Sequence, residues 1–240
     1  DHPALFGNMD GLERPGKVIR QIREGGADAI LTSYGVSKQF VKEISDMGLI
    51  LRMDGGLSAL AQERGPLHLI YQVEDALRLG ADAAGCMGMP GSRLESQMLP
   101  YLSELIGQCA AWNMPVMAEM LPGGFENPAE LWTAENIGHA CRIGAELGVD
   151  FIKTTYSGDG ESFRQIVDQT YVPSVILGGS RSGEPRDLLE NIHGAIQAGA
   201  SGVACGRNIC QFEDPVKMAA AVAAIIHEDA TVDDALEIIK

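Results

Sequence analysis

One lysine lies in a segment where a charged side chain is unusual. Lys153 sits within Asp150–Thr155, a short run typical of a buried strand, whereas the other five lysines fall on helix-like or terminal segments. Burial disfavours the ammonium form, so a lysine in a strand wall is enriched in the free amine that attacks a carbonyl to form an iminium. The alternative interpretation is a lysine paired with a carboxylate for structural reasons alone.

Two glycine-rich segments follow the last two predicted strands and could bind a phosphate group. Glycines let backbone N–H groups approach an anion, and an arginine adds charge-assisted hydrogen bonds. Each segment alone is equally well explained as an ordinary turn, but barrel enzymes commonly bind phosphate at these two positions. The predicted phosphate-binding residues are Gly178, Gly179, Ser180, Arg181, Gly206 and Arg207.

Strand-like and helix-like segments alternate along the chain. This pattern is typical of βα units around a parallel sheet, and their right-handed repetition closes into a (β/α)8 barrel. Four strands are preceded by Gly-Ala or Gly-Val, where glycine suits the left-handed end of a helix. The predicted strands are Asp28–Ser33, Leu49–Met53, Asp82–Cys86, Pro115–Met120, Asp150–Thr155, Ser174–Leu177 and Gly202–Cys205. The predicted helices include Lys17–Glu24, Gln97–Ala111, Glu135–Leu147, Arg186–Ala198 and Pro215–His227.

Seven strands are predicted, whereas a closed barrel of this class has eight. We expect the first strand upstream of Asp1, or else an incompletely closed barrel. On this count Lys153 lies on the sixth strand, and alternation places Phe151, Lys153 and Thr155 on the face that lines the barrel mouth. No linker or low-complexity stretch divides residues 1–240, so a single catalytic domain is expected.

The composition argues against several classes of function. The formal charge of −15 opposes binding to nucleic acid or anionic lipid. No apolar run approaches the roughly 20 residues of a membrane-spanning helix, and no leader-like segment opens the chain. The five cysteines lack a CxxC pair and the spacing of a zinc site. We therefore expect reduced, mostly buried thiols in a cytoplasmic protein, with no metal.

Five short motifs carry a resemblance to a known family. They are Asp1-His2, GMPGS at 88–92, DFIKTTYSGD at 150–159, Gly178-Gly179 and ASGVACGRNICQ at 200–211. With these motifs, essentially the whole chain resembles the archaeal-type class I fructose-bisphosphate aldolases. That group belongs to the DeoC/LacD superfamily, whose members include the autoinducer-2 phosphate thiolase and the aminodideoxyheptulosonate synthases.

The resemblance implies roles for three residues. Lys153 would be the Schiff-base lysine, Asp1 a carboxylate near the reacting carbons, and His2 a further catalytic residue. It also implies the phosphate-binding role of the two glycine-rich segments, a reaction that needs no cofactor, and assembly into a homo-oligomer, including ring-based forms.

The sequence departs from the fructose-bisphosphate aldolases at their proton donor. Those enzymes place a tyrosine general acid where this chain has Leu121, and the thiolase-like branch also lacks the tyrosine. Glu119 lies two residues earlier, on the same strand face, and would act as an acid or base if its surroundings raise its pKa. The alternative is an ion pair between Glu119 and a basic residue such as Arg52.

Three further residues are predicted to contact substrate: Arg52, Ser58 and Tyr156. Arg52 belongs to a Leu-Arg pair that also resembles the thiolase-like branch. Ser58 would reach substrate hydroxyl groups or, alternatively, cap the next helix. Tyr156 begins a stretch that could close over substrate, although its composition is equally good turn chemistry.

The leading hypothesis is a class I aldolase that cleaves or forms a carbon–carbon bond in a short phosphorylated ketose or a related carbonyl compound. One alternative is thiolase-like acyl transfer from a phosphorylated diketone to coenzyme A. A second is a non-covalent sugar-phosphate isomerase or synthase, and a third is a phosphate-ligand binding barrel without activity. In each case the expected partner is a small phosphorylated molecule.

Overall fold

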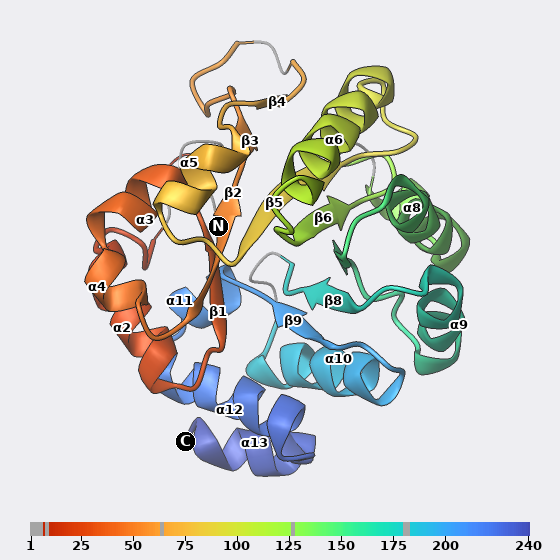
Figure 1. Ribbon diagram of the computed structural model, residues 1–240. Coiled ribbons are helices and arrows are strands. Elements are labelled where there is room, and N and C mark those ends of the chain that lie inside the picture. The colour runs from red at the N-terminus through yellow and green to blue at the C-terminus, as the bar shows by residue number, and fades with distance from the viewer. Residues whose placement is uncertain (1–6, 8–9, 63–64, 126–127, 180–182) are drawn as a thin grey trace.

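Seven parallel strands surround a central axis in the computed structural model, which describes residue 7 and residues 10–62, 65–125, 128–179 and 183–240 (Figure 1). The strand order is β1-β2-β5-β6-β7-β8-β9, so each strand lies beside the next one along the chain. Their bounds are β1 Ala29–Thr32, β2 Gly48–Arg52, β5 Ala83–Gly88, β6 Val116–Met120, β7 Phe151–Thr154, β8 Ser174–Leu177 and β9 Gly202–Ala204. This is a nearly closed barrel, as predicted.

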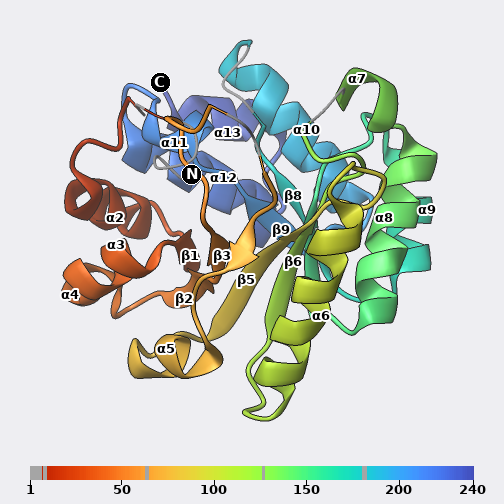
Figure 2. The ribbon, with the colours of Figure 1, turned by 90° about the horizontal axis from the view of Figure 1, so that it is seen from above.

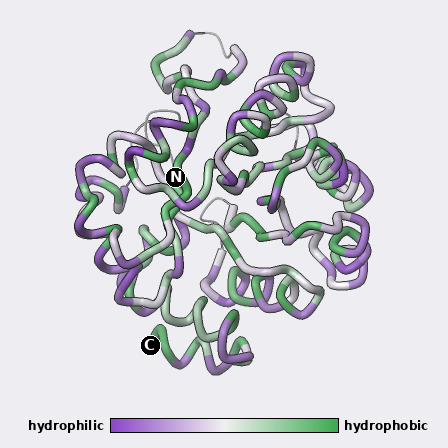
Figure 3. The backbone as a smooth tube through the Cα atoms, in the orientation of Figure 1, coloured by the Kyte–Doolittle hydropathy of each residue, from purple (hydrophilic) through white to green (hydrophobic). Residues whose placement is uncertain are grey.

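Helices cover the outside of the barrel, and Figure 2 shows them on both sides of the strands. In Figure 3 the helices alternate between hydrophobic and hydrophilic positions, as expected for helices with one buried face. The longer helices are α2 Pro15–Glu24, α6 Glu95–Ala110, α8 Ala134–Leu147, α9 Gly160–Thr170, α10 Pro185–Gln197 and α12 Pro215–His227. The shorter ones are α3 Tyr34–Gln39, α4 Val41–Ile44, α5 Val73–Arg78, α7 Pro128–Leu131, α11 Arg207–Cys210 and α13 Val232–Ile238.

The strand side chains divide between two faces. Alternate residues such as Leu51, Ala118 and Ile152 are fully buried in the main hydrophobic core beneath the helices. The residues between them face the barrel interior, where the register pairs Met117 with Phe151 and Glu119 with Lys153. The register therefore aligns Glu119 and Lys153 side by side on the interior face of adjacent strands.

The predicted glycine caps are confirmed. Gly26, Gly80, Gly148 and Gly199 all have positive φ values, between 70° and 104°. These are left-handed conformations that turn each helix back toward the sheet.

In the described residues β1 and β9 are the two edges of the sheet, and helices bridge them. The end of α2 packs against α12, and a Cβ at Gly25 would lie 2.6 Å from the carbonyl oxygen of Val216. Only glycine fits this close approach. Lys153 is on β7, the fifth of the seven strands described in this sheet, and the eighth strand expected upstream of Asp1 stays a prediction.

A small hairpin leaves the barrel directly after β2 and was not predicted. Strand β3 (Asp54–Gly55) pairs antiparallel with β4 (His68–Leu69), and the pair projects from the barrel beside α6 (Figure 1). The hairpin begins at Met53, whose carbonyl oxygen accepts a hydrogen bond from the Ile70 N–H at 3.0 Å. This hairpin places Asp54 at the carboxyl end of β2.

Candidate active site

Lys153 lies near the carboxyl end of β7 and forms an ion pair across to β6. Its Nζ atom is 3.0 Å from Oε1 of Glu119, and the two side chains are 14% and 9% exposed. The prediction that Lys153 faces the barrel interior is confirmed. The carboxylate pair, considered as the alternative interpretation of this lysine, is also present. The amine is partly exposed at the carboxyl end of the barrel, where enzymes of this fold bind their substrates. The ion pair with Glu119 is therefore compatible with attack of this amine on a substrate.

Arg52, at the end of β2, joins this pair from the opposite side. Its Nη1 atom is 3.6 Å from Oε2 of Glu119, and its guanidinium also forms a two-pronged ion pair with Asp54. Asp54 is 1% exposed and accepts a further hydrogen bond from the Met87 N–H at 3.0 Å. Four charges therefore alternate in sign from Asp54 through Arg52 and Glu119 to Lys153, and their sum is zero.

The electrostatics of Glu119 distinguish between its two interpretations. Burial alone would raise the pKa of this carboxyl, but attraction to Lys153 and then to Arg52 outweighs it and lowers the pKa. The condition set for acid–base action, a raised pKa, is therefore not met, and the alternative ion pair between Glu119 and Arg52 is present. For Arg52, burial opposes the charge, yet Asp54 and Glu119 together raise its pKa. Glu119 is a stable anion at neutral pH, suited to balance a cation.

The two glycine-rich segments meet at the carboxyl ends of β8 and β9. The Asn208 side-chain amide donates to the carbonyl oxygens of Gly178 and Gly179, at 2.7 and 3.4 Å. A Cβ at Gly178 would lie 2.3 Å from Cβ of Cys205, so this approach needs glycine. Gly206 precedes α11 as its N-cap residue. Asn208 thus fixes one segment against the other.

Cys205 connects these segments with the lysine. Burial raises the pKa of its thiol to about 12, and the nearby Lys153 charge acts in the opposite direction. Cys205 immediately precedes Gly206. The Lys153 charge therefore acts on the segment that follows β9. All five cysteines are free, and Cys86, Cys109 and Cys141 are buried, which confirms the expectation of mostly buried thiols.

Two predicted substrate contacts, Ser58 and Tyr156, lie in other settings, as does Leu121, the residue at the position of the family tyrosine. Ser58 is exposed in the loop of the hairpin, where its Oγ accepts a hydrogen bond from the Leu60 N–H at 3.2 Å. It therefore caps a turn, not a helix. Tyr156 packs edge-on against Phe163, with ring centroids 5.2 Å apart, and its hydroxyl lies against Gly194 of α10. Leu121 is fully buried in the main core.

Four predicted site residues lie outside the described residues: Asp1, His2, Ser180 and Arg181. Their roles stay predictions. The structure adds three residues that sequence reasoning missed: Asp54, Tyr101 and Asn208. A polar residue at the carboxyl end of a barrel strand is a signal that could have found Asp54, and Asn208 lies inside a motif already singled out. No sequence signal pointed to Tyr101, which is on α6.

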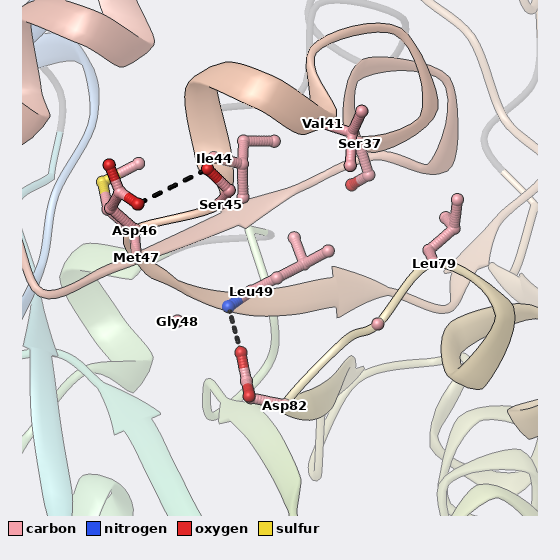
Figure 4. Close-up of a pocket in the computed structure, with 11 residues that line it drawn as sticks. Ser37, Val41, Ile44, Ser45, Asp46, Met47, Gly48, Leu49, Leu79 and Asp82 are labelled. Carbon is pink, nitrogen blue, oxygen red and sulfur yellow. Dashed lines mark hydrogen bonds between the residues drawn. The ribbon is translucent and has the colours of Figure 1, made fainter.

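A cavity of about 440 Å³ lies at the other end of the barrel, beside the amino end of β2 (Figure 4). It is lined by residues such as Ile44, Leu49 and Asp82, far along the strands from Lys153. We assign it no part in the chemistry.

Within the described ranges, no group of three or more His, Cys, Asp or Glu side chains is placed to hold a metal ion. Every helix in this part of the chain falls short of what a membrane crossing requires.

Comparison with known proteins agrees with this geometry. The model of the DeoC/LacD family aldolases matches residues 1–212. A 2-amino-3,7-dideoxy-D-threo-hept-6-ulosonate synthase from Halobacterium salinarum is 36% identical over 239 residues, covering 98% of this chain and 88% of that protein.

Two solved structures of archaeal fructose 1,6-bisphosphate aldolases are also similar. One has a TM-score of 0.85 at 29% identity and covers 95% of this chain and 91% of its own. The other, in which the catalytic lysine is covalently bound to the carbinolamine intermediate, has a TM-score of 0.81 at 30% identity, with 89% and 84% covered. The chain described here therefore belongs to the DeoC/LacD family of aldolases.

Proposed function

We propose that this protein is a class I aldolase in which Lys153 forms a Schiff base with a short phosphorylated ketose. The observation that carries the proposal is the Lys153 amine, partly exposed on the interior face of β7 and held 3.0 Å from Glu119. Attack by the neutral amine on the substrate carbonyl gives a carbinolamine, and loss of water gives an iminium. The iminium accepts the electron pair released when the bond between the α and β carbons breaks, as the β-hydroxyl loses its proton and becomes the carbonyl of the released aldehyde. Protonation of the resulting enamine and hydrolysis then release the ketone and the free lysine.

Glu119 serves as the counter-ion of this cation. Its lowered pKa keeps it ionised through the cycle, and the positive charge passes from the ammonium to the iminium at nearly the same place. A carboxylate fixed in advance at that position stabilises charge without having to reorganise. The proton transfers at the reacting carbons are assigned to Asp1 and His2, on the resemblance alone.

The substrate phosphate binds at the segments that follow β8 and β9. The proposal is supported by the close approach of Gly178 to Cys205, by the Asn208 hydrogen bonds, and by the position of Arg207 at the start of α11. Ser180 and Arg181 complete the site. Because β8 lies next to β7, a phosphate held there leaves a short sugar extending toward Lys153.

A second candidate reaction is acyl transfer from a phosphorylated diketone to coenzyme A. It is favoured by Leu121, which is buried in the core where the fructose-bisphosphate aldolases carry their tyrosine acid. Product analysis with and without coenzyme A separates the two reactions. An acyl-coenzyme A product would identify the thiolase-like reaction, and free aldehyde would identify the aldolase.

The protein is further proposed to act in the cytoplasm as a single-domain homo-oligomer. The free thiols support a reducing compartment. Exposed apolar side chains, among them Leu60 at 92% and Val41 at 56%, support association with further copies. Sedimentation of the purified protein tests the assembly.

Borohydride trapping tests the proposed function. The protein is incubated with fructose 1,6-bisphosphate and with a panel of other phosphorylated ketoses, reduced, and digested for mass spectrometry. The expected adduct is on Lys153, and it should be absent from Lys153→Met but retained in Lys42→Met, which removes an exposed lysine. If the phosphorylated ketoses bind but borohydride traps none of them on a lysine, the protein is instead a non-covalent isomerase or synthase, or a binding barrel without activity.

A further inference from the structure

We infer that Tyr101 and Asp54 form a positioning pair for the Schiff-base reaction, which fixes Arg52 so that Glu119 is shared between Arg52 and Lys153. The inference rests on the proposed function and extends it to two buried residues. Tyr101 is 8% exposed and Asp54 is 1% exposed. Neither is offered as a catalytic residue, because each acts on the lysine only through other side chains.

The Asp54 carboxylate has little freedom to move. Its Oδ2 atom lies 3.0 Å from both the Met87 N–H nitrogen and the Tyr101 hydroxyl, and Nη2 of Arg52 is 3.3 Å away. Oδ1 accepts from Nε of Arg52. Such a two-pronged pair sets the plane of the guanidinium as well as its position.

The Tyr101 hydroxyl reaches this carboxylate from outside the barrel. Tyr101 belongs to α6, yet its oxygen lies 3.0 Å from the Met87 carbonyl oxygen as well as 3.0 Å from Asp54. Its single hydrogen can be donated to one of these acceptors. Burial and the Asp54 charge raise the pKa of this hydroxyl, so it remains a donor. Through this hydroxyl, helix α6 contacts the series of alternating charges that runs from Asp54 to Lys153.

Arg52 divides the attraction of Glu119 between two cations. One Glu119 oxygen is 3.6 Å from Nη1 of Arg52 and the other is 3.0 Å from Nζ of Lys153. A carboxylate shared in this way holds the lysine ammonium less tightly than an unshared one would. Asp54 in turn limits how strongly Arg52 competes for Glu119.

Among the described residues, Cys86 is a further titratable group beside these charges. It faces Asp54, Arg52 and Tyr101, and burial raises its pKa well above the usual range, so it is a neutral thiol. The charge felt by Lys153 from this side is therefore set by Asp54, Arg52 and Glu119. Without the Asp54 charge, Glu119 alone balances Arg52, so Arg52 competes more strongly with Lys153 for that carboxylate. This disfavours the ammonium form of Lys153 and also the iminium.

Three variants of the whole protein test the inference. Asp54→Asn removes the charge at nearly constant shape, and Tyr101→Phe removes one hydroxyl without changing any charge. Asp82→Asn makes the same change as Asp54→Asn at the opposite end of the barrel, where the Asp82 carboxylate accepts from the Leu49 N–H. The readouts are the pH dependence of Lys153 methylation by formaldehyde and cyanoborohydride, read by mass spectrometry, and the kcat and KM for fructose 1,6-bisphosphate.

In Asp54→Asn the pH midpoint of Lys153 methylation should fall by roughly half a unit or more, and kcat should fall roughly tenfold with KM nearly unchanged. Tyr101→Phe should shift both in the same direction by less, and Asp82→Asn should leave both as in the wild type. The inference is overturned if Asp54→Asn and Tyr101→Phe keep the wild-type midpoint and kcat, or if Asp82→Asn shifts equally. A wild type that forms no borohydride adduct would overturn the proposed function, and this inference with it.

Discussion

At the amino end of the barrel strands, aspartates bind the backbone, whereas at the carboxyl end acidic side chains bind cations. Asp82 and Asp150 each follow a Gly-Ala or Gly-Val pair and are exposed. The Asp82 carboxylate accepts from the Leu49 N–H at 2.8 Å, as Figure 4 shows, and Asp150 accepts from the Val116 N–H at 2.7 Å. In both cases the aspartate N–H also donates to the carbonyl oxygen of the same residue.

The acidic residues at the carboxyl end differ in burial and in partners. Asp54 and Glu119 are buried, and each lies between positively charged groups or strong donors. The aspartates at the amino end thus stabilise strand pairing, whereas Glu119 contacts the amine that is proposed to react. The comparison teaches that position along a barrel strand, and not residue type, separates stability from chemistry in this fold.

Replacing Lys153 gives the largest expected effect. Lys153→Met should lower kcat/KM by on the order of 10⁴-fold or more, because the other five lysines lie on helices or at the C-terminal end and not on a barrel strand. Lys153→Arg keeps a cation next to Glu119 and should be equally inactive. Urea unfolding should show both variants folded. Substantial turnover by Lys153→Arg would mean that the lysine only supplies charge.

Replacing Glu119 tests its role as a counter-ion. Glu119→Gln keeps the shape but not the charge, and kcat should fall by about 100-fold, as for loss of one preorganised electrostatic contact. KM should change less, since the phosphate-binding segments are untouched. Glu146→Gln, on the exposed face of α8, is the matched control. Equal kcat values in the two variants would contradict the assignment.

The amino end should respond in stability instead of rate. Asp150→Ala leaves the N–H of buried Val116 without its partner and should lower the free energy of unfolding by about 1–3 kcal/mol. Asp82→Ala should behave alike, and the exposed helical residue Asp168 provides a control. Chemical denaturation and steady-state kinetics measure the two effects. A large loss of kcat at full stability in Asp150→Ala would break the comparison.

The strands were predictable because each carries its own local signal. All seven predicted strands of the sheet are present, and no end is shifted by more than two residues, because each apolar run follows a glycine cap or a turn. The β3–β4 hairpin was not predictable because each strand has two residues, too few for any periodic pattern. Its long loop also separates the two strands in the sequence.

The site was predictable only in part, for a physical reason. Lys153, Glu119 and Arg52 are near strand ends, where alternation fixes the facing direction, so their meeting followed from the fold. Tyr101 and Asp54 are 47 residues apart in the sequence. The pattern of α6 predicts which of its side chains are buried, but not which residue each of them contacts. The sequence left the sign of the Glu119 pKa shift open, because that sign depends on two cations from different strands, a balance that no single segment contains.

The smallest predicted effect is a contribution of Glu119, at the carboxyl end of the barrel, to the pH dependence of stability. The pKa of Glu119 is lowered in the folded protein from its ordinary value of 4.5, so its ionisation stabilises the fold above that value. This contribution is lost as the pH falls through the lowered pKa. Urea unfolding from pH 7 to pH 3 should therefore show a weaker loss of stability in Glu119→Gln than in the wild type. If the free energy of unfolding depends on pH equally in the two proteins, the ion pairs of Glu119 do not lower its pKa and do not contribute to stability.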